Sequence, residues 1–137
     1  MVRQVETRDI PTLAKLWYAE KPKTCFNKLD IEWSELRCAE FLAEQRVNLN
    51  GAMFISEING QIVAAIGINI SDHFLPPYPR VMNEWMWLGS NKREVVKVFQ
   101  AAKEYGRQHG ATLFTYVLNV PGQSATKFTE TYRWEVL

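Results

Sequence analysis

The sequence predicts an α+β domain of the three-layer α/β kind, with a mixed, mostly antiparallel central sheet and helices on both of its faces. Three observations lead to this prediction. The hydrophobic period is helical early in the chain and changes to strand-like runs in the middle. Asn59-Gly60 joins two of these runs as a hairpin turn, which makes them antiparallel. A long amphipathic segment then separates the apolar runs 81–88 and 112–120, and such a crossover makes these two strands parallel.

Length and composition indicate an ordinary globular protein. The 137 residues are expected to form one domain spanning 1–137, and an apolar fraction of 47% excludes a mainly disordered chain. A net charge of +1 argues against bulk binding to nucleic acid or to an anionic membrane. No stretch approaches the ~20 apolar residues of a membrane span, and the N-terminus lacks the apolar core of a signal peptide. With only Cys25 and Cys38 and no disulfide framework, we expect a protein of the cytoplasm or of another reducing compartment.

The first third of the chain is expected to hold a short strand and two helices. Residues Arg3–Val5 are extended in character, and Asp9 is expected to cap a helix with Pro11 in its first turn. A second helix is predicted from near Asp30 to the stop signal at Asn48–Gly51. Its buried stripe, wound at 100° per residue, is expected to contain Trp33, Leu36, Ala39, Ala43 and Val47.

The middle of the chain is expected to form three strands. Ala52–Ile58 and Gln61–Ile70 flank the hairpin turn, and the second run is apolar on both faces, as in a central strand covered by helices. Ser71–Arg80 is proline-rich and is predicted to be a loop before the strand Val81–Leu88. Alternation along this last strand is expected to place four side chains on one face: Met82, Glu84, Met86 and Leu88.

The last third begins with a helix that Ser90 or Asn91 caps and that runs through His109 to a stop at Gly110. Its inner face is expected to contain Val95, Val98, Phe99, Ala102 and Tyr105. Thr112–Val120 is rich in β-branched and aromatic residues and reads as a strand. Ser124–Thr131 is predicted to be a short helix and Trp134–Leu137 a terminal strand stub.

This order of elements resembles the fold of the GCN5-related N-acetyltransferases (GNAT) over nearly the whole chain. The resemblance is most specific from Val81 to Trp134, where Glu84–Leu88, the helix to Gly110 and the strand 113–117 look like the family's acetyl-CoA-binding core. The run Ser124–Trp134 is similar to the family's C-terminal Asn-x-x-Ala-x-x-Phe-Tyr-Glu-Lys-x-Gly-Phe run. The resemblance implies acetyl-CoA, or another acyl-CoA, as cofactor and a small-molecule or protein amine as acceptor.

The sequence also departs from the family pattern at the positions that hold the cofactor. The signature Gln/Arg-x-x-Gly-x-Gly/Ala becomes Ser90–Val95, with Arg93 and Val95 in place of the two glycines. Side chains there obstruct the close approach of the backbone to pyrophosphate. Thr129 replaces the tyrosine that often acts as general acid, Arg133 replaces a glycine, and the chain ends before the family's usual final strand. Small GNAT-like proteins with eroded phosphate loops occur in phage genomes, so a phage origin is an expectation.

The resemblance implies roles for specific residues. Glu84, a carboxylate in the middle of an apolar strand, is the candidate general base, and its apolar neighbours are expected to raise its pKa. Nine residues are candidates for cofactor binding: Trp87, Leu88, Gly89, Ser90, Asn91, Lys92, Arg93, Val95 and Val96. Three loop residues are candidates for substrate binding: His73, Phe74 and Tyr78. The alternatives are a rim carboxylate paired with a basic residue and an ordinary capped helix with solvated charges.

Two functions are therefore consistent with the sequence. The first is an acetyl-CoA-dependent N-acetyltransferase, in which an amine attacks the thioester directly and Glu84 takes the proton. The second is a catalytically degenerate GNAT-like protein that acts as a binding, assembly or regulatory module. The sequence shows no cluster with metal-ligand spacing, and it leaves a homodimer open.

Overall fold

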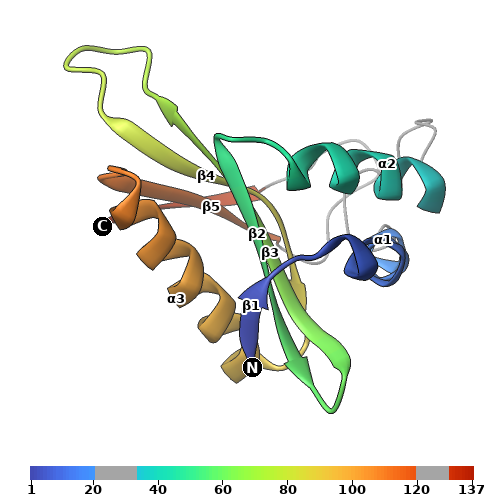
Figure 1. The fold of residues 1–137 in the computed structure, drawn as a ribbon. Coiled ribbons are helices and arrows are strands. Elements are labelled where there is room, and N and C mark those ends of the chain that lie inside the picture. The colour runs from blue at the N-terminus through green and yellow to red at the C-terminus, as the bar shows by residue number, and fades with distance from the viewer. Residues whose placement is uncertain (21–33, 120–129) are drawn as a thin grey trace.

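The computed structural model describes residues 1–20, 34–119 and 130–137, which form a single sheet flanked by helices (Figure 1). The strands are β1 (Val2–Gln4), β2 (Gly51–Ile58), β3 (Gln61–Asp72), β4 (Arg80–Gly89), β5 (Leu113–Asn119) and β6 (Glu130–Val136). The helices are α1 (Ile10–Ala19), which follows a 3-10 turn at Thr7–Asp9, α2 (Glu35–Arg46) and α3 (Lys92–Gln108).

The strands of the 6-stranded sheet lie in chain order. All neighbouring pairs are antiparallel except β4 and β5, which are parallel because α3 carries the chain back between them. Figure 1 shows α3 on one face of the sheet and α1 and α2 on the other. The predicted mixed, mostly antiparallel sheet with helices on both faces is confirmed.

Each face of the sheet has its own apolar core. On the face of α1 and α2, Leu13 and Leu42 are fully buried against the strands. On the face of α3, Phe114 and Ala102 are fully buried. The central strand β3 contributes to both cores, as its apolar run predicted, because successive side chains point to opposite faces.

Several local predictions hold. Asn59 and Gly60 both have positive φ, at 51° and 76°, as a type I′ hairpin turn requires. The predicted inner face of α3 is confirmed, since all five of its residues belong to the core on that side of the sheet. Asn91 is the N-cap residue of α3, and His109 follows the helix as its C-cap.

The predicted buried stripe of α2 is wrong. Leu36 and Val47 are 68% and 69% exposed, whereas Cys38 and Leu42 are buried. The helix is turned so that Cys38 and Leu42, one turn apart, face the sheet, and Ala39 packs beside them. The apolar pattern of α2 is weak, because this helix is only weakly amphipathic. Packing against the sheet therefore decides which side of the helix is buried. Trp33, Cys25 and the predicted helix start near Asp30 lie outside the described residues.

The prediction that Met82, Glu84, Met86 and Leu88 share one face of β4 is also wrong. The register of β3 and β4 shifts between Gly67, which lies opposite Met86, and Ile68, which lies opposite Glu84. Trp85 is therefore the extra residue of a β-bulge, and a bulge reverses the alternation that follows it. Met82 packs in the α3 core, while Met86 and Leu88 pack in the core under α1 and α2.

The C-terminal strand is longer than expected. β6 spans Glu130–Val136 and pairs antiparallel with the whole of β5, so the predicted helix is wrong at Glu130 and Thr131. The rest of that predicted helix, including Thr129, lies outside the described residues. Glu130 and Thr131 join the strand because β5 would otherwise be an unpaired edge of the sheet. A strand in this position has side chains that alternate between the two faces of the sheet.

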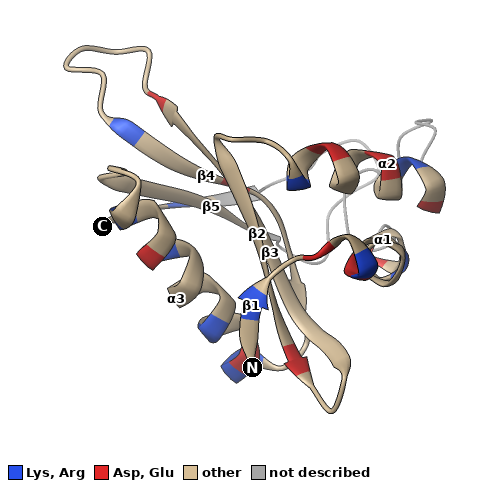
Figure 2. Ribbon diagram, in the orientation of Figure 1, with Lys and Arg blue, Asp and Glu red and all other residues tan. Residues whose placement is uncertain are grey.

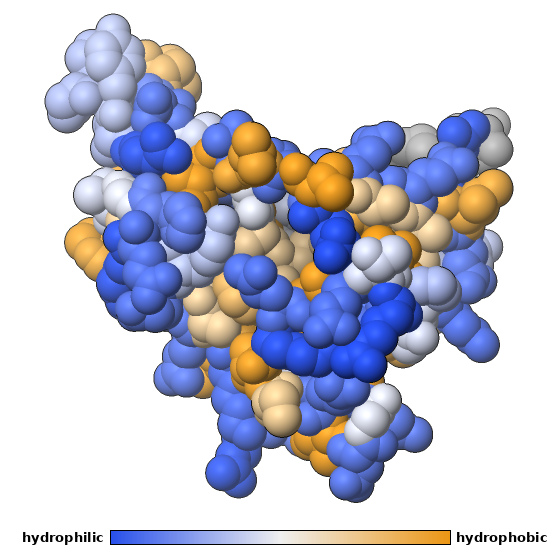
Figure 3. All heavy atoms as spheres, in the orientation of Figure 1, coloured by the Kyte–Doolittle hydropathy of each residue, from blue (hydrophilic) through white to orange (hydrophobic). Residues whose placement is uncertain are grey.

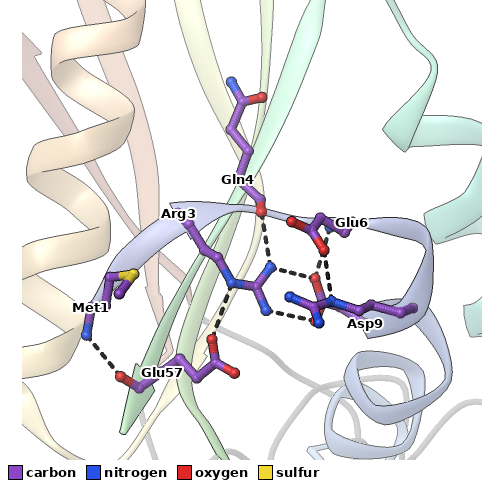
Figure 4. A network of polar contacts seen from close by, with 7 residues as sticks. Met1, Arg3, Gln4, Glu6, Asp9 and Glu57 are labelled. Carbon is purple, nitrogen blue, oxygen red and sulfur yellow. Dashed lines mark hydrogen bonds and ion pairs between the residues drawn. The ribbon is translucent and has the colours of Figure 1, made fainter. Parts of the chain in front are cut away.

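An ion-pair network ties the N-terminal strand to α1. Arg3 donates to both carboxylate oxygens of Asp9, at 2.7 and 2.9 Å, and to Glu57 at 3.0 Å (Figure 4). Asp9 also accepts the backbone N–H of Glu6 at 2.7 Å. The guanidinium of Arg3 holds the pKa of Asp9 below its ordinary value. Asp9 stands at the N-cap position of α1, as predicted, but its side chain bonds to Arg3 and Glu6 and caps no N–H of α1.

Figure 2 shows charged residues mainly on the helices, and the strands β2 and β3 carry them only near their ends. No described helix is long and apolar enough to cross a membrane. Among the residues that the structure places, no three His, Cys, Asp or Glu side chains gather as metal ligands.

Candidate functional site

The strands β4 and β5 part soon after they meet. Their pairing is limited to Val81–Asn83 of β4 and Leu113–Thr115 of β5, although β4 continues to Gly89 and β5 to Asn119. The hydroxyl of Thr115 donates to the side-chain oxygen of Asn83 at 2.7 Å at the last paired position. A gap therefore opens in the sheet from Glu84 onward.

Two side chains of β4 bridge this gap to a single residue of β5. The backbone N–H of Val117 donates to the Glu84 carboxylate at 3.2 Å, and the indole N–H of Trp87 donates to the Val117 carbonyl at 2.8 Å. Both peptide groups of Val117 are thus bonded to side chains and not to a neighbouring backbone. Trp87 also meets Phe99 of α3 edge-on, with ring centroids 6.0 Å apart. The chain's own side chains occupy the gap between the strands.

The bulge at Trp85 is what allows both bridging side chains to lie on the same side. Because Trp85 and Met86 both pack toward α1 and α2, the next residue, Trp87, returns to the α3 face. The Trp85 indole lies directly over Gly67, where a Cβ would come within 2.2 Å of its ring. It also packs edge-on against Phe41 at 5.1 Å. Its N–H is the one buried side-chain polar group of the described residues that has no hydrogen-bond partner.

The start of α3, where the resemblance implied a pyrophosphate site, is closed by its own cap. Only Ser90 and Asn91 separate β4 from the helix. The side-chain oxygen of Asn91 accepts the backbone N–H groups of Arg93 and Glu94 at 3.1 and 3.4 Å. These are two of the donors that a helix start would otherwise offer to an anion.

A buried carboxylate reinforces that closure. Glu94, in the first turn of α3, is only 4% exposed. It accepts a short hydrogen bond from the hydroxyl of Ser56 on β2, and Lys97 binds its other oxygen at 2.7 Å. The Lys97 ammonium and, to a lesser degree, the Ser56 hydroxyl lower the pKa of Glu94, so it is charged at neutral pH. A negative charge here offsets the positive end of the helix dipole.

Of the remaining candidate residues at the helix start, some pack against other side chains and others are exposed to solvent. Val95 packs against Gly89, where a Cβ would lie 2.8 Å from Cγ2 of Val95. Leu88 is buried in the other core, under α1 and α2. Lys92 and Arg93 are exposed, and Val96 is 52% exposed. The basic pair therefore remains on the surface, while Val95 packs against the end of β4 at Gly89.

The predicted substrate-binding residues lie elsewhere. His73, Phe74 and Tyr78 belong to the tip of the β3–β4 hairpin, which projects from the body of the molecule (Figure 3). Phe74 and Tyr78 are 79% and 60% exposed, and the His73 ring stacks on Phe74 at 4.7 Å. The tip precedes the paired part of β4, whereas the gap opens after it. The structure therefore does not bring these three residues together with Glu84.

Sequence reasoning found Glu84, Trp87 and the helix start, but it missed three residues that complete the arrangement. Val117 was missed because its role depends on where two strands part, which no local pattern reports. Ser56 and Glu94 did carry a signal, since a hydroxyl stands in the middle of an apolar strand and a carboxylate in the first turn of a helix. Their pairing across 38 positions of sequence appears only in three dimensions.

No family model and no curated protein matches the sequence. Solved structures match its fold. A ribosomal-protein-alanine N-acetyltransferase from Brucella melitensis is 13% identical with a TM-score of 0.73, covering 100% of this chain and 99% of that one. A protein named as a predicted acetyltransferase, with acetyl-CoA, from Clostridium acetobutylicum is 12% identical with a TM-score of 0.63, covering 81% of this chain and 75% of that one. A transcriptional regulator from Bacillus halodurans is 10% identical with a TM-score of 0.66, covering 83% and 78%.

These likenesses establish the architecture that the resemblance implied. The chain has the GNAT fold, a mixed sheet with helices on both faces, and several proteins that share it are named as acetyltransferases. At 10–16% identity the likeness extends to the fold and not to a particular activity.

Proposed function

We propose that this chain is a GNAT-fold binding and assembly module that does not catalyse acyl transfer from acyl-CoA. One observation carries the proposal: its own side chains occupy both the start of α3 and the gap between β4 and β5. These are the two places where an acyl-CoA needs open backbone, at its pyrophosphate and along its pantetheine arm.

At the start of α3, the residues present do not fit a pyrophosphate. Such a group is held by free N–H donors and by the positive end of the helix dipole. Here Asn91 already accepts the N–H groups of Arg93 and Glu94, and the buried Glu94 carboxylate opposes the dipole. A pyrophosphate would have to displace the Asn91 cap and compete with the Glu94 carboxylate for the positive end of the helix. The exposed Lys92 and Arg93 attract anions only at the surface, where solvent screens them.

In the gap, the residues present do not fit a pantetheine arm. An extended arm would bond to the strands as an added strand does, through free N–H and C=O groups. Val117 has both of its groups bonded to Glu84 and Trp87. The Trp87 indole reaches from β4 across to the Val117 carbonyl of β5, through the space that the arm would fill.

Exposed apolar surface supports a binding role. The hairpin tip exposes Phe74, Leu75 and Tyr78 by 79%, 53% and 60%. Together these side chains offer apolar surface to a partner at one end of the molecule. The fold is also shared by a protein described as a transcriptional regulator, so it is found outside proteins named as acetyltransferases.

A second candidate function is N-acetylation of an amine with Glu84 as general base. The specific observation in its favour is that β4 and β5 do part, and that the Glu84 carboxylate lies where they part. This candidate requires Trp87 and Asn91 to move aside when a cofactor arrives.

Calorimetric titration with acetyl-CoA separates the two candidates. We expect no binding by the wild-type protein up to millimolar concentration. A variant that reopens both places, Trp87→Ala with Asn91→Gly, Glu94→Gln and Val95→Gly, should gain detectable binding, provided circular dichroism shows that it remains folded. Submillimolar binding by the wild type, lost in Arg93→Glu and kept in Glu84→Gln, would contradict the proposal and favour the acetyltransferase.

A further inference from the structure

Two asparagines of this chain are followed by glycine, Asn50 before Gly51 and Asn59 before Gly60. Such a pair is chemically labile. The backbone nitrogen of the glycine can attack the side-chain carbon of the asparagine, because glycine has no Cβ to obstruct the approach. The two sites have the same reactive groups, and both asparagines are exposed. The backbone around each site therefore decides which of them reacts.

This attack needs one movement of the backbone. The peptide group between the asparagine and the glycine has to rotate until the glycine nitrogen faces the side-chain carbon. The rotation changes ψ of the asparagine and φ of the glycine, and it turns the C=O and N–H of that peptide group away from any partners. A peptide group without hydrogen bonds can make this movement, whereas one that is bonded at both ends reacts only after local opening of the fold.

The peptide group between Asn59 and Gly60 can rotate. It lies in the turn between β2 and β3, at one end of the sheet (Figure 1). Among the hydrogen bonds of the described residues, none involves the carbonyl of Asn59 or the N–H of Gly60. Asn59 has a φ of 51°, and a Cβ at Gly60 would meet nothing within 4 Å. Glycine accepts either sign of φ, so this peptide group can turn while Ile58 stays paired with Gln61.

The peptide group between Asn50 and Gly51 is held at both ends. The Asn50 carbonyl accepts the N–H of Ile70 at 2.7 Å, and the N–H of Gly51 donates to the Asn48 carbonyl at 3.3 Å. The side-chain oxygen of Asn48 also accepts the N–H of Asn50 at 2.9 Å. A Cβ at Gly51 would lie 2.6 Å from Oδ1 of Asn69, so the surroundings are tight. Rotation of this peptide group would break its hydrogen bonds, and the folded chain therefore protects Asn50.

We propose that Asn59 is a site of spontaneous deamidation to aspartate and isoaspartate, whereas the fold protects Asn50. The Gly60 nitrogen loses its proton and bonds to Cγ of Asn59, the Cγ–Nδ2 bond breaks, and the side-chain nitrogen leaves as ammonia. Water then opens the cyclic imide. Addition of water at Cγ gives aspartate, and addition at the backbone carbonyl carbon gives isoaspartate, which lengthens the turn by one backbone carbon. The modification does not depend on whether acyl-CoA binds.

Peptide mapping of the full chain after incubation at neutral pH tests this proposal. Cleavage after Glu57 separates the two sites, mass spectrometry measures the deamidation of each, and fragmentation distinguishes isoaspartate from aspartate. We expect Asn59 to deamidate at least about ten-fold faster than Asn50 in the folded protein, because Asn50 reacts only after local opening. In concentrated urea the two rates should become similar, because both asparagines precede a glycine. Equal rates in the folded protein, or a difference that persists in urea, would overturn the proposal.

Two variants test the reactive site and the protected site separately, with circular dichroism to check that each remains folded. Asn59→Gln should abolish deamidation at this position, because the longer side chain has to close a larger ring, and it should leave the rate at Asn50 unchanged. Asn48→Ala removes the side-chain acceptor of the Asn50 N–H, so it should speed the deamidation of Asn50 and not that of Asn59. A folded Asn48→Ala variant with an unchanged rate at Asn50 would contradict the protection inferred from these hydrogen bonds.

Discussion

Replacing Asp9 by asparagine tests the N-terminal ion-pair network. Asparagine has the same shape as aspartate, but it has no charge and one of its oxygens becomes an NH₂ group. In the native chain Arg3 donates to both carboxylate oxygens at 2.7 and 2.9 Å, and the Asp9 side chain is only 9% exposed. The variant keeps one acceptor and turns the other into a donor that faces a guanidinium. Arg3 keeps its bond to Glu57 at 3.0 Å.

The expected cost follows from these contacts. A hydrogen bond to a charged group contributes about 1.5–3 kcal/mol, and breaking a buried ion pair costs about 3–5 kcal/mol. Because the Arg3 side chain is 18% exposed and keeps Glu57, the lower part of this range applies. We expect Asp9→Asn to lower the free energy of unfolding by about 2–3 kcal/mol at pH 7. The matched control, Glu57→Gln, should cost only about 0.5–1 kcal/mol, since that carboxylate is more exposed.

Urea unfolding followed by circular dichroism measures both variants across pH. The pKa of Asp9 is lowered in the folded chain, so its stabilising effect is complete above the unfolded pKa of about 3.9 and is lost as the pH falls through the lower, folded value. The difference between wild type and Asp9→Asn should therefore be constant from about pH 5 to 8 and shrink below about pH 4. A loss under about 0.5 kcal/mol at pH 7, or a difference that grows in acid, would refute this account of the network.

Three further substitutions test the rest of the structure. Asn91→Ala should cost about 1 kcal/mol in thermal unfolding by removing the cap of α3, whereas the exposed neighbour Lys92→Ala should stay within about 0.5 kcal/mol of the wild type. Gly67→Ala should cost about 1–3 kcal/mol and alter the near-ultraviolet circular dichroism, because the new methyl meets the Trp85 ring; an unchanged spectrum would contradict the bulge packing. Phe114→Ala should cost about 3–5 kcal/mol in urea unfolding because Phe114 is fully buried, while Phe74→Ser at the exposed hairpin tip should change stability by less than about 0.5 kcal/mol.

Strong local patterns predicted most of the fold. The amphipathic helix α3, the Asn59-Gly60 turn and the two-sided apolar run of β3 each depend on residues close together in sequence, so their signals could be read directly. The crossover at α3 then required β4 and β5 to be parallel, as observed. Weak patterns failed where packing decided the outcome. The orientation of α2 comes from the core that receives Cys38 and Leu42, and the residues Glu130 and Thr131 join a strand because β5 lies beside them.

The candidate site was predictable in part for the same reason. Asn91 was visible in the sequence as a candidate cap, and Arg93 and Val95 at the positions of the family's two glycines suggested an eroded phosphate loop. The bulge at Trp85 could not be predicted from the sequence. The run Glu84-Trp85-Met86-Trp87 is compatible with either assignment of its side chains to the two faces of the sheet. That bulge decides that Trp87, and not Met86, lies in the gap beside Glu84.

The sequence by itself determined the class of fold, the order of its elements up to β5 and the hairpin turn. These depend on periodicity and on backbone preferences, which act over a few residues. Only the tertiary structure decided which side chains meet where β4 and β5 part and at the start of α3. Val117 meets Glu84 and Trp87 because β4 and β5 part after three paired positions, and Glu94 meets Ser56 because α3 lies across β2. Contacts between residues this far apart in the chain depend on how whole elements pack, and no local pattern contains that information.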